Sequence, residues 1–232
     1  DISNVTDVSG MFKNAFSFNG DLSSWDVSSI TNMNAMFENA ESFEGDLSLW
    51  DVSNVTSMRE MFAGAVSFQS DLSNWNVSNV MDMFRMFKLS FYNGDLSSWD
   101  VSSVENMQAM FNTNPAFNGD ISGWNVVSLT NMHNMFVNAS NFNRNISSWD
   151  VSNVTLMSNT FKNAESFNQN LSNWDIASVT NMEGIFNGQT GLNDINKCYM
   201  DDAFQSNAVW PYEWIGHCQP SLSEIADASI LE

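Results

Sequence analysis

The sequence predicts an elongated repeat solenoid, a leucine-rich-repeat-like right-handed coil with one short parallel strand and one short helix per 25-residue repeat. Three observations support this fold class: a recurring tryptophan, a recurring phenylalanine with the same period, and an aliphatic residue that precedes each tryptophan by three positions. A fixed period of this length is typical of arrays whose units bury their apolar faces against their neighbours. The tryptophans are Trp25, Trp50, Trp75, Trp99, Trp124, Trp149 and Trp174.

The segment around each tryptophan is the predicted strand. Trp25 and Val27 lie two positions apart, so both side chains share one face of an extended segment, and Leu22 precedes them as a further apolar residue. Copies stacked about 4.8 Å apart would form one row of a parallel sheet. The tryptophans would then form a continuous aromatic column inside the protein.

A short helix is predicted after the strand. Ile30, Met33, Met36 and Phe37 follow the spacing of a helical face, and Thr31 is placed to cap the helix start. Two residues after each recurring phenylalanine, six of eight positions hold Asn or Gly. These residues tolerate the left-handed conformation that ends helices.

One unit departs from the period. Phe87 and Tyr92 are five residues apart where the other units have six, and Leu89, Ser90 and Phe91 replace the usual corner. The same unit carries Arg85 and Lys88, so we expect an altered surface there.

The repeats fade after Ile195. We therefore predict two parts: residues 1–195 form a solenoid of about eight coils, and residues 196–232 form a C-terminal cap over the apolar face of the last coil. Cys198 and Cys218, the only cysteines, fall in this cap. They form a disulfide in an oxidising compartment or remain two free thiols in a reduced protein. Because the chain starts within a repeat, we expect it to be part of a longer protein.

The charge of the chain limits its partners. Seven basic residues stand against 27 acidic ones, which gives a net charge of −20. Such a field repels nucleic-acid backbones and anionic lipid surfaces, so we expect no nucleic acid partner. No apolar run approaches the roughly 20 residues that a membrane span needs, so we expect no direct membrane insertion by this segment.

The repeat from Phe18 to Phe37, found again from Phe43 to Phe62, resembles the BspA-like leucine-rich repeat surface proteins, in the branch with tryptophan in the strand. The similarity covers residues 1 to about 192. It implies a leucine-rich-repeat-like fold, an extracellular or cell-surface location, and a role in adhesion or binding. It transfers no catalytic or ligand-binding residues, because the family has no shared site motif.

Catalysis is not expected. The two histidines are His133, within a repeat, and His217, next to Cys218. A cysteine and a histidine adjacent in sequence do not form the arrangement that a thiol nucleophile needs. No zinc, phosphate-loop or serine-nucleophile motif is present. We therefore predict a non-enzymatic protein without a cofactor.

The predicted binding face consists of the residue immediately before and the residue immediately after each tryptophan. These side chains would point outward and meet a protein or glycan partner. Its members are Ser24, Asp26, Leu49, Asp51, Asn74, Asn76, Ser98, Asp100, Asn125, Ser148, Asp150, Asn173 and Asp175.

Calcium binding, as in a mineral-associated structural protein, is an alternative for the acidic members of this face. Stacked carboxylates about 5 Å apart repel one another, and this repulsion either raises their pKa or recruits a cation such as calcium. A solvated acidic surface is the other interpretation, and a passive spacer is a third function. The weak metal candidates are Asp26, Asp51, Asp100, Asp150 and Asp175. A second aspartate column precedes the predicted strand and is interpreted as structural: Asp21, Asp46, Asp71, Asp95 and Asp120, continued by Asn145 and Asn170.

Overall fold

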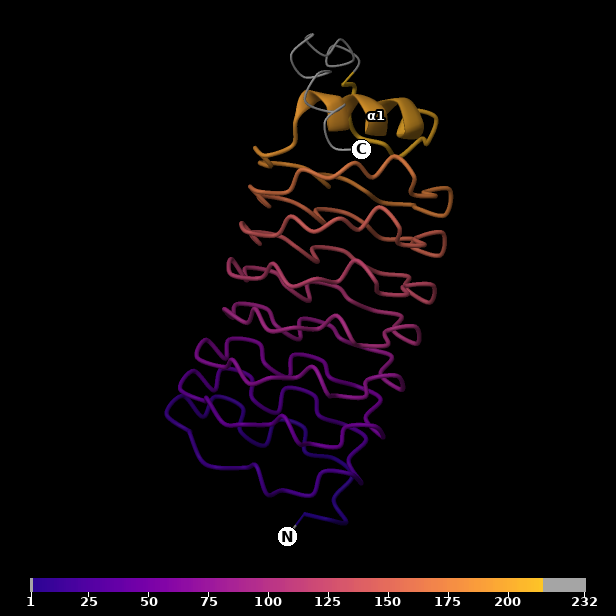
Figure 1. Ribbon diagram of the computed structural model, residues 1–232. Coiled ribbons are helices and arrows are strands. Elements are labelled where there is room, and N and C mark those ends of the chain that lie inside the picture. The colour runs from indigo at the N-terminus through magenta and orange to yellow at the C-terminus, as the bar shows by residue number, and fades with distance from the viewer. Residues whose placement is uncertain (1, 215–232) are drawn as a thin grey trace.

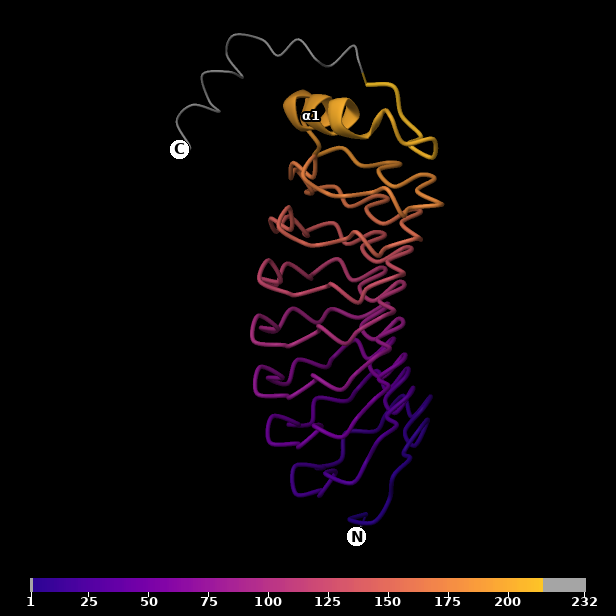
Figure 2. The same cartoon turned by 90° about the vertical axis from the view of Figure 1, so that its right-hand side faces the viewer.

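The computed structural model describes residues 2–214, which form a stack of similar coils that ends at helix α1, Asp194–Phe204 (Figures 1 and 2). In this range α1 is the only helix and no strand is present. The predicted fold class is therefore wrong, because the coils lack the strand and the helix that a leucine-rich-repeat-like unit requires. Each coil is instead built from consecutive turns.

The predicted strand around tryptophan is absent because its amides bond locally. The N–H of Trp25 donates to the carbonyl of Leu22 at 3.0 Å, and the N–H of Ile30 donates to the carbonyl of Val27 at 2.9 Å. These bonds close two tight turns, so the same amides cannot pair with a neighbouring coil. Within residues 2–214, the only β-bridge between adjacent coils is an isolated parallel one at Asn32 and its equivalents.

The predicted helix is absent because alternate amides donate to the next coil rather than back along the chain. The amides of Met33, Ala35, Phe37 and Asn39 donate to next-coil carbonyls at 2.6–3.1 Å. The amides of Met36 and Glu38 close local turns. An α-helix would need every amide to bond four residues back. We call residues 32–39, with their equivalents in the other coils, the spine segment.

Two residues of each spine segment are left-handed. The position two after the recurring phenylalanine has a positive φ in all eight coils, which confirms the predicted conformation although no helix ends there. A second left-handed position, four residues earlier at Ala35, was not predicted. Thr31 caps no helix, and its hydroxyl donates to the carbonyl of Thr6 in the preceding coil. The eight predicted positions are Asn14, Asn39, Gly64, Leu89, Thr113, Asn138, Asn163 and Gly188.

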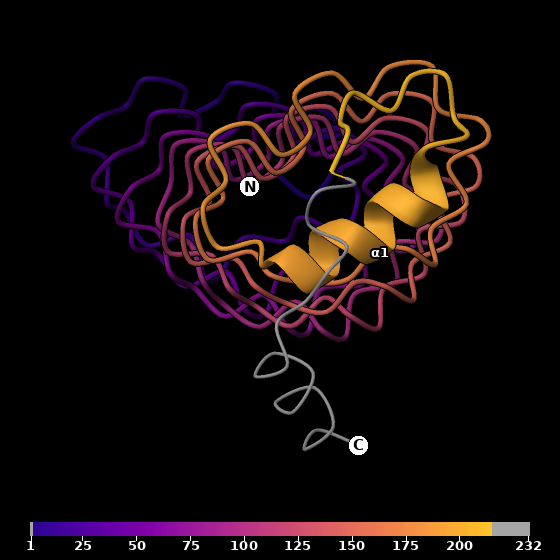
Figure 3. The ribbon, with the colours of Figure 1, turned by 90° about the horizontal axis from the view of Figure 1, so that it is seen from above.

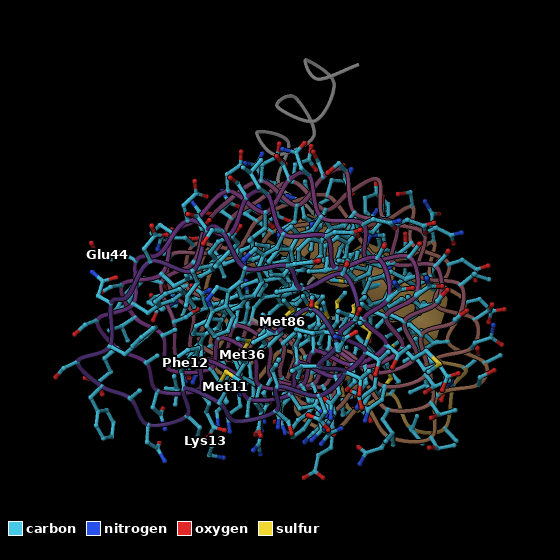
Figure 4. The ribbon with its side chains drawn as sticks, turned by 90° about the horizontal axis from the view of Figure 1, so that it is seen from below. Met11, Phe12, Lys13, Met36, Glu44 and Met86 are labelled. Carbon is cyan, nitrogen blue, oxygen red and sulfur yellow. The ribbon has the colours of Figure 1, made fainter. Side chains whose placement is uncertain are left out.

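Stacked phenylalanines form the continuous column of the core. The ring of Phe37 lies 5.4 Å from Phe12, 5.7 Å from Phe62 and 4.3 Å from Phe43, all in stacked geometry. Seen from below, Met36 and Met86 lie within the outline of the stack, whereas Lys13 and Glu44 project from its edge (Figure 4). The apolar positions of successive coils therefore fill one shared core.

The tryptophans are tied to the preceding coil rather than only stacked. The indole N–H of Trp50 donates to the carbonyl of Leu22 at 3.1 Å, and five further tryptophans make the equivalent bond. Each bond gives a buried carbonyl a partner across the coil boundary, which holds adjacent coils in register.

Helix α1 lies across the C-terminal end of the stack (Figure 3). Asn193 caps the helix by accepting from the N–H of Asn196 at 2.8 Å, and its own N–H donates to Asn168 of the last coils at 2.9 Å. The hydroxyl of Tyr212 accepts from the spine amide of Phe186 at 2.9 Å. Of the predicted cap, residues 215–232 lie outside the described part of the chain, as do Cys218 and His217. The disulfide predicted for Cys198 thus stays a prediction.

Candidate functional site

The candidate site is the surface formed by the residues immediately before and after each tryptophan, which we call the turn face. All thirteen predicted members are exposed. Leu49 is the most exposed large apolar side chain among the described residues, at 83% of its maximum. The turn face therefore presents polar and acidic side chains with one apolar side chain among them.

Buried anchors on both sides position this face. Leu22, Val27 and Ile30 are buried at the ends of the two turns of one coil, and Trp50 is buried at the equivalent place in the next coil. Because these anchors point inward, the residues that flank each tryptophan point to solvent. The turn face is thus a consequence of how the core packs.

Hydrogen bonds from serine determine the state of the turn-face carboxylates. Asp26 accepts from the N–H of Ser28 at 3.1 Å and from its hydroxyl at 2.6 Å. These bonds favour the ionised form and lower the pKa of Asp26, and Ser53 lowers the pKa of Asp51 in the same way. The expectation that repulsion between neighbouring carboxylates raises the pKa is wrong, because the charge of Asp26 acts on Asp51 more weakly than the Ser53 hydrogen bonds do.

The second aspartate column makes the same kind of turn, which confirms its structural interpretation. Asp21 accepts from the N–H of Ser23 at 2.9 Å, and Asn145 and Asn170 accept from the equivalent amides at 3.0 and 2.9 Å. On the turn face, Asn76 accepts from Ser78 in the same manner. The amide oxygen of an asparagine therefore closes this turn as the carboxylate of an aspartate does, so the turn does not require the negative charge.

The metal candidates do not converge. No three His, Cys, Asp or Glu side chains come together as a metal site within residues 2–214. Asp100 accepts from Ser102 and is separated from the other turn-face carboxylates by Asn76 and Asn125. Each of these aspartates is used by its own turn instead.

Two further points of the sequence analysis concern His133 and membrane insertion. The ring nitrogens of His133 lie within hydrogen-bond distance of Ser158 and Asn134. The part of the chain that the structure describes contains no helix that is both long and apolar enough to cross a bilayer.

Two cations gather around an aromatic ring, an arrangement that was not predicted from the sequence. The guanidinium carbons of Arg59 and Arg85 lie 4.3 and 4.4 Å from the ring centroid of Phe84. The only signal in the sequence was the departure from the period in the unit that also carries Lys88. The three residues come from two coils, so the sequence alone did not show that they meet.

One comparison with known proteins identifies a family. A family model described as "Mycoplasma protein of unknown function, DUF285" matches residues 1–92 and again residues 88–199. Together the two matches cover most of the chain and overlap only at residues 88–92, as expected for a repeated unit. No curated protein matches the chain.

Proposed function

The chain belongs to the DUF285 family, and we propose that it is a non-enzymatic binding module whose turn face meets a protein or glycan partner outside the cell or at its surface. The resemblance of the repeats to BspA-like surface proteins supports this location and an adhesive role. The single observation that carries the proposal is the exposure of all thirteen turn-face residues on a core that repeats from coil to coil.

Variation along the face supports a role in recognition. The serine two positions before each tryptophan is the same in every coil, whereas the next position changes from Ser24 to Leu49, Asn74 and Gly123. Those side chains are free of the core, so packing does not dictate them. Repeat arrays commonly present such variable positions on a regular scaffold to bind extended partners.

Charge supports a cationic partner. The carboxylates of Asp26, Asp51, Asp100 and Asp150 have a lowered pKa and are ionised at neutral pH. Each uses one oxygen in its turn, and its second oxygen makes no hydrogen bond within the described residues. A lysine-rich protein segment or an amino sugar could pair with these oxygens along the stack.

The test measures binding of an oligolysine peptide and of a glucosamine oligosaccharide at physiological ionic strength. The variant D26N/D51N/D100N/D150N/D175N keeps the turns, because Asn76 makes the same turn in the native chain. Removal of five exposed charges on the face should weaken binding by about tenfold or more.

The matched control is D21N/D46N/D71N/D95N/D120N, which removes five charges from the second aspartate column. This variant has the same net charge as the first, so it should retain most of the binding. Equal losses in both variants would mean that net charge alone attracts the probes. Failure of the native chain to bind either probe would favour the spacer function.

A further inference from the structure

We propose that a second surface, the cationic patch, binds an acidic protein segment that carries an aliphatic or aromatic side chain. The patch lies on the third and fourth coils, around the shortened unit. It consists of Arg59, Phe84, Arg85, Lys88, Leu89 and Phe91.

The charged part of the patch is preorganised. Phe84 lies within cation–π distance of both guanidinium groups, and each arginine is also held by an ion pair. Arg59 contacts Asp82 at 2.6 Å and Arg85 contacts Glu60 at 3.1 Å. Side chains held by two contacts lose little conformational freedom when a partner binds.

The backbone of the patch carries large residues where smaller ones would be less strained. Arg85 and Leu89 have φ values of 54° and 55°. The left-handed conformation costs a residue with a side chain roughly 1–2 kcal/mol. At the position of Arg85 other coils place Gly, Asn, Ala or, once, Glu60, and Leu89 replaces the usual Asn or Gly. Neither side chain fills the core, because Arg85 is partly exposed and Leu89 is 49% exposed. Every coil is left-handed at these two positions, and this coil differs in carrying a large side chain at both.

The patch attracts carboxylates on a molecule that otherwise repels them. Asp82 and Glu60 pair with Arg59 and Arg85, and Glu38, which also lies near Lys88, is already ion-paired with Lys13. Partial burial, together with the charge of Arg85, lowers the pKa of Lys88. Lys88 makes no ion pair within residues 2–214, so a carboxylate from a partner would complete its environment. Elsewhere the net charge of −20 opposes an acidic segment.

An apolar surface adjoins the cations. Leu89 and Phe91 are about half exposed, at 49% and 51%. Between them Ser90 is buried, and its hydroxyl donates to the carbonyl of Phe87 at 2.8 Å. The shortened corner therefore directs one side chain inward and its two neighbours outward. An acidic segment with a leucine or phenylalanine matches both parts of the patch.

The experiment measures binding of an acetylated peptide of alternating glutamate and leucine to the native chain and to the variant R85N/K88N. Asn occupies both positions in other coils, at Asn134 and Asn112, so the variant should melt no lower than the native chain. Its affinity for the peptide should fall by about tenfold or more. The matched control R144Q/K162N removes two cations from other coils and should stay within about twofold of the native affinity.

A second variant, L89N/F91S, tests the apolar part and should also weaken binding, whereas a glutamate–serine peptide should bind the native chain poorly. The proposal is overturned if the native chain does not bind the glutamate–leucine peptide, if both cation variants lose equal affinity, or if the serine peptide binds as well. It is also overturned if sedimentation shows a native dimer that R85N/K88N abolishes, because the occupant is then a second copy of the chain.

Discussion

The spine segment and the turn face are two parts of the same coil that are stabilised in different ways. In the spine segment, four amides per coil donate to the next coil, and the phenylalanine between them stacks on both neighbours. In the turns that carry the turn face, the backbone amides bond locally: Trp25 to Leu22, Ile30 to Val27, and Ser28 to Asp26. The coils are therefore joined mainly along the spine segment.

This difference separates stability from surface chemistry. A change in the spine segment disturbs three coils at once, because its bonds and rings are shared with both neighbours. A change at an exposed turn-face position affects one turn. The turn face can therefore vary between Ser24, Leu49 and Asn74 while the stack remains regular.

The largest expected effect comes from removing a spine ring. Phe111 is fully buried and stacks on Phe87, Phe117 and Phe136 at 5.8, 3.7 and 5.7 Å. F111A should lower the free energy of unfolding by about 3–5 kcal/mol. L49A, on the turn face, should change it by less than about 0.5 kcal/mol. Urea denaturation followed by tryptophan fluorescence measures both, and similar costs would contradict the distinction.

An intermediate effect is expected at the left-handed positions. Ala35 has a φ of 54°, so A35G should relieve strain and raise the free energy of unfolding by up to about 1 kcal/mol. The control A40G, in the same coil, changes a buried alanine without a left-handed backbone and should destabilise the protein by roughly 1 kcal/mol. Thermal melting compares the two, and a shift of the melting temperature in the same direction for both substitutions would show that Ala35 is not strained.

The smallest effect is expected from acid. Hydrogen bonds from serine lower the folded-state pKa of Asp26, Asp51, Asp100 and Asp150 below the unfolded value of about 3.9. Their stabilisation is therefore complete above that value and is lost as the pH falls through the folded pKa. The urea midpoint should stay constant from neutral pH to about pH 5 and fall below about pH 4. In D26N/D51N/D100N/D150N that fall should be smaller. An unchanged acid profile in this variant would show that other groups dominate.

Much of the packing could be predicted from the sequence, because burial follows the period. Leu22, Val27 and Met33 are buried as the pattern indicated, and Asn14 and Asn39 are left-handed. The error was the local structure between these points. In consecutive turns, an amide donates to the carbonyl three residues earlier, and this gives apolar residues the same spacing as in a helix. Spacing alone therefore did not distinguish the turns from a helix.

The remaining differences depend on backbone directions that side-chain types do not report. Ala35, Glu60 and Arg85 are left-handed although none of them favours that conformation, because the amide must point to the next coil. The two aspartate columns were assigned different roles, yet both accept from the residue two positions later. The cluster around Phe84 forms between coils, and sequence analysis found only its irregular unit.

Amide hydrogen exchange tests the central claim most directly. In the middle of the stack, the amides of Arg85, Phe87 and Phe111, which donate to the next coil, should exchange only on global unfolding. The amides of Ser97 and Ser102, which lie in the turns that carry the turn face and donate to exposed carboxylates, should exchange orders of magnitude faster. Equal protection of the two sets would contradict the claim that the spine segment holds the coils together and leaves the turn face free to vary.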